Sequence, residues 1–130
     1  MYERVYKVVR VNNEGRYLSA FYKSLPPEFV REYLPGRTTR GWPKSPLAAF
    51  STIAAARKLI ADESSIVVRE TMRILLCEYT PYTGKKRRRL LFGPLERQWR
   101  AFWAKDVEGT IPWPDYTVLC DSITPLWLVV

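Results

Sequence analysis

The stretch LAAFSTIAAARKLIADESSIVVRETMRILLCEY, residues 47–79, decides the fold that we expect for this chain. It opens on the apolar run Leu47 to Phe50 and continues into a segment, Thr52 to Ala61, whose apolar residues recur at helical spacing. Three consecutive alanines add helix propensity. We take Ser51 as the N-cap, because a serine hydroxyl accepts hydrogen bonds from the free N–H groups of a first helical turn. The sequence therefore predicts a helix over 52–61.

The residues after this helix favour extended structure. A turn at 62–65 is followed by Ile66, Val67 and Val68, and then by the run Arg73 to Tyr79, which carries apolar side chains on both faces. A strand buried on both sides has this pattern. The stretch as a whole thus predicts a strand, a helix and a central strand.

The remaining segments can be arranged around that unit. We expect a hairpin from strands 4–11 and 16–21, a short helix at 28–33 and a second long helix at 94–105 with an apolar stripe. The last two predicted strands are 116–123 and 125–130, the second beginning at Pro125. The predicted fold class is α+β: one domain over residues 1–130, with a twisted mixed or mainly antiparallel sheet of five to seven strands, two main helices (52–61 and 94–105) and one short helix (28–33).

Composition narrows the class of protein. The chain of 130 residues is 47% hydrophobic, so we expect it to fold as a compact domain. No apolar run reaches the ~18 residues of a membrane span, so we expect no membrane partner. The first residues, Met1 to Arg4, lack the hydrophobic segment of a signal peptide. These features predict a cytoplasmic protein.

Catalytic and metal-binding residue types are scarce. The chain has no histidine, which removes the commonest general base and the Ser-His and Cys-His nucleophile pairs. Its two cysteines, Cys77 and Cys120, lie in apolar runs and are expected to be buried thiols, although a disulfide between them remains an alternative. We therefore expect neither a metal nor an organic cofactor, and we assign no enzymatic activity on these grounds.

Positive charge is concentrated in one region. Residues 85–105 hold eight basic residues and one acid, in a chain of net charge +8. Such a cluster can neutralise phosphates and release counterions, which predicts salt-sensitive binding to nucleic acid, or it can steer an acidic protein surface. The alternative is a solvated loop that discourages aggregation. The cationic candidates are Lys85, Lys86, Arg87, Arg88, Arg89, Arg97 and Arg100.

Two tryptophans in loops are candidates for stacking. Trp42 lies in a basic loop and Trp113 lies between two prolines. An exposed indole ring stacks well on a base, whereas the alternative is that each ring closes the edge of the core.

Short pieces along most of the chain resemble small uncharacterised proteins of phages and prokaryotes. These pieces are YKVVR (6–10), SA (19–20), YLPGR (33–37), AFS (49–51) and DSITPL (121–126). Their outline is in turn similar to the ADP-ribosyltransferase-like fold, in which an arginine ends an early strand, a Ser-Thr-Ser strand end precedes a helix and a Glu-x-Glu turn supplies the catalytic acid. The resemblance implies that Arg10, Ser51 and Glu108 line an NAD-binding cleft. The chain departs from that pattern with Phe-Ser-Thr at 50–52 and Asp-Val-Glu at 106–108.

Three functions are therefore open at this stage. The first is a small basic interaction protein, of phage origin on the resemblance above, that binds nucleic acid or an acidic protein surface. The second is a divergent ADP-ribosyltransferase-like protein, and the third is a homo-oligomeric structural component, suggested by the 14% aromatic content.

Overall fold

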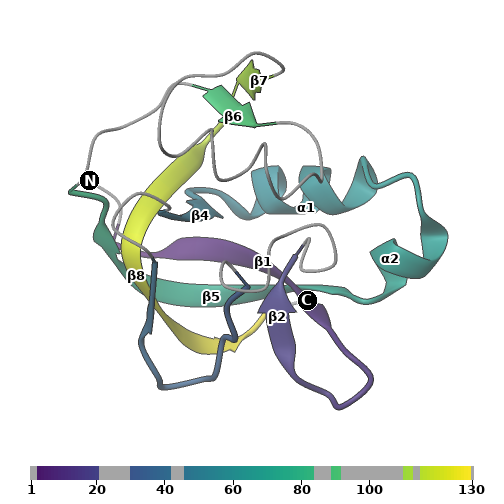
Figure 1. Ribbon diagram of the computed structural model, residues 1–130, viewed down its shortest axis with the longest axis horizontal. Helices are drawn as coiled ribbons and strands as arrows, with labels where there is room; N and C mark the ends of the chain where they lie inside the picture. The colour runs from purple at the N-terminus through teal and green to yellow at the C-terminus, as the bar shows by residue number, and fades with distance from the viewer. Residues whose placement is uncertain are drawn as a thin grey trace.

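The computed structural model describes residues 3–20, 30–41, 46–83, 89–91, 110–112 and 115–129, with the backbone alone for 89–91 and 110–112. Ten elements lie in these ranges (Figure 1). They are the strands β1 (Val5–Val11), β2 (Tyr17–Ser19), β3 (Thr39–Arg40), β4 (Leu47–Phe50), β5 (Met72–Pro81), β6 (Arg89–Leu91), β7 (Thr110–Pro112) and β8 (Thr117–Leu128), and the helices α1 (Ile53–Ala61) and α2 (Ile66–Glu70).

The strands close into a barrel. β1 pairs with β5, β5 with β8, β8 with β4, and β4 returns to β1, all antiparallel. β2 pairs with β1 and β3 with β8 as outer strands, while β6 and β7 form a separate two-stranded sheet. Closure removes the exposed sheet edges that an open sheet of this size would present.

The predicted α+β class is therefore wrong. The described part of the chain is a strand-rich barrel of four strands with two outer strands, and its two helices have nine and five residues. A twisted mixed or mainly antiparallel sheet with two main helices was expected, because periodicity identifies strands without showing that they close into a barrel. The predicted helix 94–105 lies outside the described residues.

Two further predictions fail, one because of a local cap and one because of pairing with another strand. Residues 66–68 form α2 instead of a strand, because the Ser65 hydroxyl accepts from the Val68 N–H at 3.3 Å and caps a helical turn. Residues 30–33 are not helical: Ser19 N–H donates to Arg31 O and Tyr33 N–H donates to Tyr17 O. This pairing extends the outer wall beside β2 and buries Tyr33 in the barrel. Residues 28 and 29 lie outside the described residues.

The end of the chain also differs from expectation. Strands predicted at 116–123 and 125–130 are one strand, β8, that passes through Pro125 without ending. Pro125 faces Cys77 at a shift in the β5–β8 register, and proline is tolerated in a strand at such irregularities because it has no N–H for a regular ladder.

Two apolar clusters hold the fold together. The first fills the barrel with Val5, Val9, Leu75, Cys77, Cys120, Ile123 and neighbouring side chains. The second lies between the barrel and α1, where Val8, Phe50, Ile74 and Met72 pack around Ala56. β1 serves both clusters because its odd-numbered residues point into the barrel and its even-numbered residues point toward α1.

Local signals in the opening hairpin and in α1 are confirmed. Gly15 adopts φ +76° in the turn between β1 and β2, and the Asn12 side chain accepts from the Glu14 and Arg16 N–H groups. α1 matches the predicted helix, but its N-cap is Thr52, whose hydroxyl accepts from Ala55 N–H at 3.1 Å. The Ser51 Oγ is buried and has no hydrogen-bond partner in the part of the chain that the structure describes.

Removing the hydroxyls of Ser51 and Thr52 is expected to have different effects on the stability of the protein. Thr52→Ala removes a helix cap and should lower the free energy of unfolding by about 1 kcal/mol. Ser51→Ala removes a buried hydroxyl that makes no bond, so it should leave stability unchanged or raise it. Urea unfolding of both variants measures this difference. A larger loss for Ser51→Ala than for Thr52→Ala would contradict the assignment of the cap.

Candidate functional site

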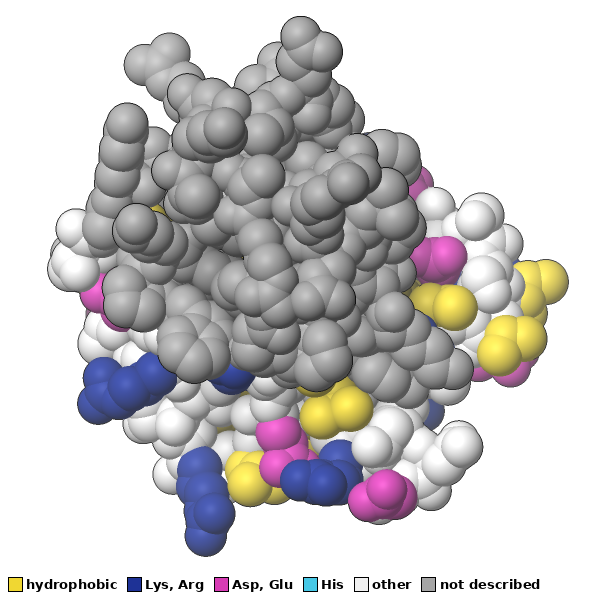
Figure 2. Space-filling view, in the orientation of Figure 1, with side chains coloured by type: hydrophobic (Ala, Val, Ile, Leu, Met, Phe, Trp, Pro, Cys, Tyr) yellow, Lys and Arg dark blue, Asp and Glu magenta, His cyan; other side chains and the backbone are white. Residues whose placement is uncertain are grey.

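Four arginines lie on the outer wall of the barrel, one before β2 and three in the segment 31–40. We call this group the arginine edge, and its members are Arg16, Arg31, Arg37 and Arg40. Glu32, which bridges to Leu18 of β2 through its backbone, binds Arg16 and feels the charge of Arg37, while Arg31 precedes it in the chain and contacts Arg40. Figure 2 shows basic side chains, with acidic ones among them, along the lower edge of the molecule.

Glu32 organises the arginine edge through charge. The Arg16 guanidinium binds its carboxylate with two groups, Nε to Oε2 and Nη2 to Oε1, the latter at 2.7 Å. This hydrogen bond, with the positive charges of Arg16 and Arg37, holds the pKa of Glu32 below its usual range. Glu32 therefore stays ionised near neutral pH and fixes Arg16 in place.

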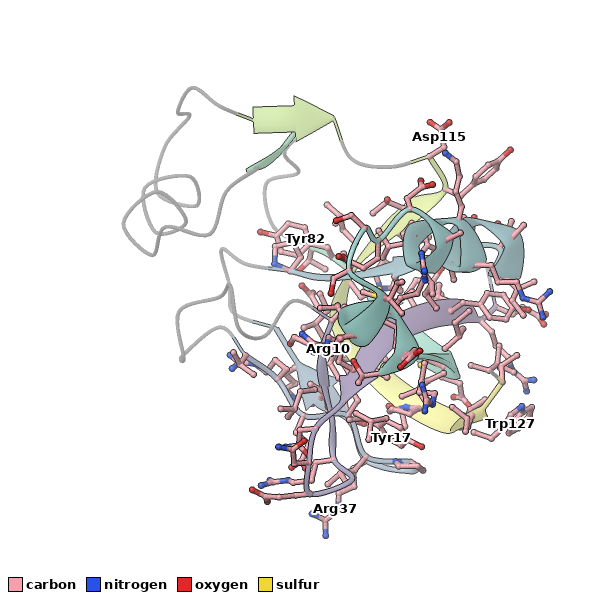
Figure 3. The ribbon with its side chains drawn as sticks, turned by 90° about the vertical axis from the view of Figure 1, so that its right-hand side faces the viewer. Arg10, Tyr17, Arg37, Tyr82, Asp115 and Trp127 are labelled. Atoms are coloured by element: carbon pink, nitrogen blue, oxygen red, sulfur yellow. The ribbon has the colours of Figure 1, made fainter. Side chains whose placement is uncertain are left out.

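Arg31 ties the two sides of the wall together. Its Nε donates to Arg40 O at 3.0 Å and its Nη1 donates to Val30 O at 3.1 Å. Burial lowers the pKa of Arg31 from its usual value, but a guanidinium keeps its charge at neutral pH. The side chains of Arg37 and Arg40 belong to exposed residues, and Arg37 points away from the barrel in Figure 3. This part of the wall thus offers exposed cations on a backbone fixed by hydrogen bonds.

A second unusual group lies inside the barrel. Lys7 occupies an inward position of β1 between Val5 and Val9, and its Nζ donates to Ala48 O at 2.6 Å. The ammonium also lies 5.2 Å from the centre of the Tyr33 ring, a cation–π contact. Although the residue keeps some exposure, burial of its charged end lowers the pKa of Lys7 to about 8.

Lys7 closes the weakest seam of the barrel. Between β1 and β4, both described throughout, one pair of residues is in register, Tyr6 with Phe50. A continued antiparallel ladder would bring Val8 opposite Ala48, but the strands diverge and the Lys7 side chain binds the Ala48 carbonyl instead. The seam is therefore held by a side chain rather than by a second pair of backbone bonds.

The two thiols beside Lys7 are buried and free. Burial raises the pKa of both Cys77 and Cys120 to about 12, so each is a neutral thiol at physiological pH. The structure has no disulfide between them, in agreement with the expectation of buried thiols.

The residues implied by the transferase resemblance do not meet in the described structure. Arg10 is buried in β1 and its Nε donates to the Thr71 hydroxyl at 3.0 Å, beside the end of α2 (Figure 3). Ser51 follows Phe50, which pairs antiparallel with Tyr6, so it is level with Val5 and lies five strand positions, or about 17 Å, from Arg10 along β1. Glu108 lies outside the described residues.

Most of the predicted binding residues also fall outside the described residues. These are Trp42, Lys85, Lys86, Arg87, Arg88, Arg97, Arg100 and Trp113. Arg89 begins β6, for which the structure describes the backbone. The sequence reasoning gave no role to Lys7, Arg16 or Arg31. Lys7 had a signal, since it interrupts the alternation of valines on the inward face of β1, whereas nothing local links Arg16 to Arg31.

The described part of the structure contains neither a cluster of metal ligands nor a membrane-spanning helix. No three Cys, Asp or Glu side chains there come close enough to hold a metal ion. No helix in the described ranges combines the length and apolarity needed to cross a bilayer.

Comparison of the chain with protein-family models, with curated proteins and with solved structures finds no match.

The lowered pKa of Lys7 predicts that the free energy of unfolding rises between pH 8 and pH 9. Because its folded pKa is lowered from 10.5 to about 8, the unfolded chain binds more protons in this window, and the free energy of unfolding increases with pH. The slope stays well below the one-proton limit of about 1.4 kcal/mol per pH unit, since the thiols of the unfolded chain begin to ionise in the same window. Above pH 9 the trend reverses, since the two thiols ionise near 9 when unfolded and near 12 when folded. Urea unfolding from pH 7 to pH 10 measures both changes.

The control uses a lysine on the surface. Lys7→Met should remove the rise between pH 8 and pH 9, whereas Lys58→Met, at an exposed position of α1, should keep it. The absence of histidine leaves this window free of other titrating side chains with ordinary pKa values near 7. An unchanged rise in Lys7→Met would show that Lys7 is not responsible.

Proposed function

We propose that this chain is a small basic binding protein that engages the phosphate backbone of nucleic acid through the arginine edge. The observation that carries the proposal is the placement of Arg16, Arg31, Arg37 and Arg40 on one wall ordered by backbone hydrogen bonds. Arg16 and Arg37 lie near Glu32, and Arg31 Nε donates to Arg40 O. Guanidinium groups bind phosphate oxygens with two parallel donors, which makes arginine well suited to this contact.

The distribution of charge supports the same function. The chain carries a net charge of +8, and much of it belongs to the basic run 85–89 together with Arg97 and Arg100, for which we keep the proposed binding role. Contacts of this kind position a nucleic acid without reading its sequence, so we expect broad rather than sequence-specific binding. An acidic protein surface is the competing partner for the same cations.

A cytoplasmic location goes with this proposal. Nucleic acid is accessible there, and the reducing conditions of that compartment are in keeping with the two free cysteines. We propose no cofactor for this function, since phosphate binding by arginine needs none.

The salt dependence of binding tests the proposal. Affinity for a short mixed-sequence oligonucleotide, measured by fluorescence anisotropy, should fall steeply between about 50 mM and about 200 mM salt. The double variant Arg37→Gln/Arg40→Gln should bind more weakly and lower the slope of log affinity against log salt by about 1.4 for a single strand.

A variant with the same net charge provides the control. Arg57→Gln/Lys58→Gln removes two exposed cations from α1, away from the arginine edge, and should change the slope less. Equal losses in both double variants would refute the assignment to the arginine edge. Absence of binding at about 50 mM salt, or tighter salt-sensitive binding to polyglutamate than to the oligonucleotide, would refute nucleic acid as the partner.

A further inference from the structure

A row of large side chains crosses the outside of the barrel in one register. Trp127 of β8 pairs with Leu76 of β5, Leu76 with Tyr6 of β1, and Tyr6 with Phe50 of β4. Residues directly opposite in neighbouring strands project to the same face, and Tyr6 belongs to the outward-pointing positions of β1. The four side chains therefore share one face of the barrel, and we call Tyr6, Leu76 and Trp127 the outer row.

Exposure increases along this line of side chains. Phe50 is 7% exposed because it packs in the cluster beneath α1, Tyr6 and Leu76 are partly buried, and Trp127 is 52% exposed. Leu128 continues the apolar surface with 47% exposure. Trp127 lies at the outer margin of the molecule, on the side away from Tyr82 (Figure 3). An indole ring held by a strand at the rim of a barrel can accept a planar ring on its exposed surface.

One arginine contacts Trp127, and a second is connected to the same strand. The Arg4 guanidinium is 5.8 Å from the centre of the indole ring. On β8, Pro125 stands two residues before Trp127, and its carbonyl accepts from Gly36 N–H at 2.8 Å. Arg37 of the arginine edge follows Gly36 directly. The outer row is thus continuous, through this one hydrogen bond, with the surface assigned to phosphate binding.

We infer that the outer row stacks bases of single-stranded nucleic acid while Arg4 and Arg37 hold its backbone. This inference rests on the proposed function and adds the class of substrate. In a duplex the bases stack on one another and show only their edges, whereas in a single strand each base offers a free ring face to an aromatic side chain. Two inter-strand spacings, about 10 Å, separate Tyr6 from Trp127, which is room for about two bases.

Two other occupants would also cover an exposed tryptophan. An apolar peptide or a second copy of this chain would bury Trp127 and Leu128, but neither accounts for Arg4 over the ring or for Arg37 on the segment bound to β8. Those charges would be desolvated without anionic partners in an apolar interface, which is costly. The placement of Arg4 and Arg37 therefore favours a polyanion with planar rings.

The test compares single-stranded and duplex oligonucleotides of the same sequence. Trp127→Ala should weaken single-strand binding by about 5-fold to about 150-fold, the range expected for loss of one stacked base, with little effect on duplex binding. Trp127→Phe should recover most of the affinity because it restores an aromatic face. The salt slope should be unchanged in both variants, since neither removes a phosphate contact.

Tyr116→Ala is the matched control. Tyr116 is 63% exposed but precedes β8 at its opposite end, so its removal should leave single-strand binding unchanged. Thermal unfolding of each variant establishes that the barrel remains folded.

Three outcomes would overturn the inference. If Trp127→Ala binds single strands as tightly as the parent while both keep their salt dependence, the outer row has no part in binding and the proposed function stands. If the parent binds the duplex more tightly than the single strand, the substrate class is wrong. If light scattering shows a dimer that Trp127→Ala converts to a monomer, the outer row is an interface between copies. Absence of any binding at about 50 mM salt instead refutes the proposed function itself.

Discussion

The barrel depends on β4, a strand of four residues that must join β8 to β1. Its backbone pairs with β8 at four positions but with β1 at one. The bond from Lys7 Nζ to Ala48 O holds the remainder of that seam, and it carries the cost of removing an ammonium from water. The contact with the Tyr33 ring offsets part of this cost, and the lowered pKa of Lys7 reflects what is left. The enclosure of the apolar core therefore depends on one polar side chain.

Closure also determines how the barrel presents its outer surface. The line of paired residues that starts at Trp127 passes through Leu76, Tyr6 and Phe50 around the barrel. It returns to β8 at Thr117, ten residues before Trp127. A small barrel with so large a stagger has steeply tilted strands. The tilt lets α1 cover one end of this line of residues and leaves the other end, at Trp127, exposed to solvent.

The arginine edge results from a different feature, the outer wall that links β2 to β3. Segment 31–33 pairs with β2, the Thr39 hydroxyl donates to Glu32 O at 2.7 Å, and β3 pairs with β8. This path joins β1 to β8 a third time, besides the connections through β5 and β4, and brings arginines from residues 16 to 40 to one surface. The same wall carries Gly36, whose bond to Pro125 connects the arginine edge with the outer row. Charge and aromatic surface are adjacent because both depend on β8.

The sequence by itself determined what short-range interactions control. The hairpin with Gly15 at a positive φ, the helix beginning after residues 51–52, and the buried strand around Ile74 to Cys77 all follow from turn chemistry, capping and periodicity within a few residues. Even there the choice between Ser51 and Thr52 as N-cap depended on which hydroxyl reaches Ala55.

Only the tertiary structure decided the rest, because long-range pairing outweighs local preference where the two compete. Residues 30–33 are extended since β2 supplies their hydrogen bonds, and β8 continues through Pro125 since neighbouring strands shift their register around it. The closure of the barrel, the position of Lys7 at its seam and the pairing of Arg16 with Glu32 are relations between residues far apart in the chain. The periodicity of apolar residues indicates which face of a strand a side chain occupies. It does not indicate which other strand will pair with that strand.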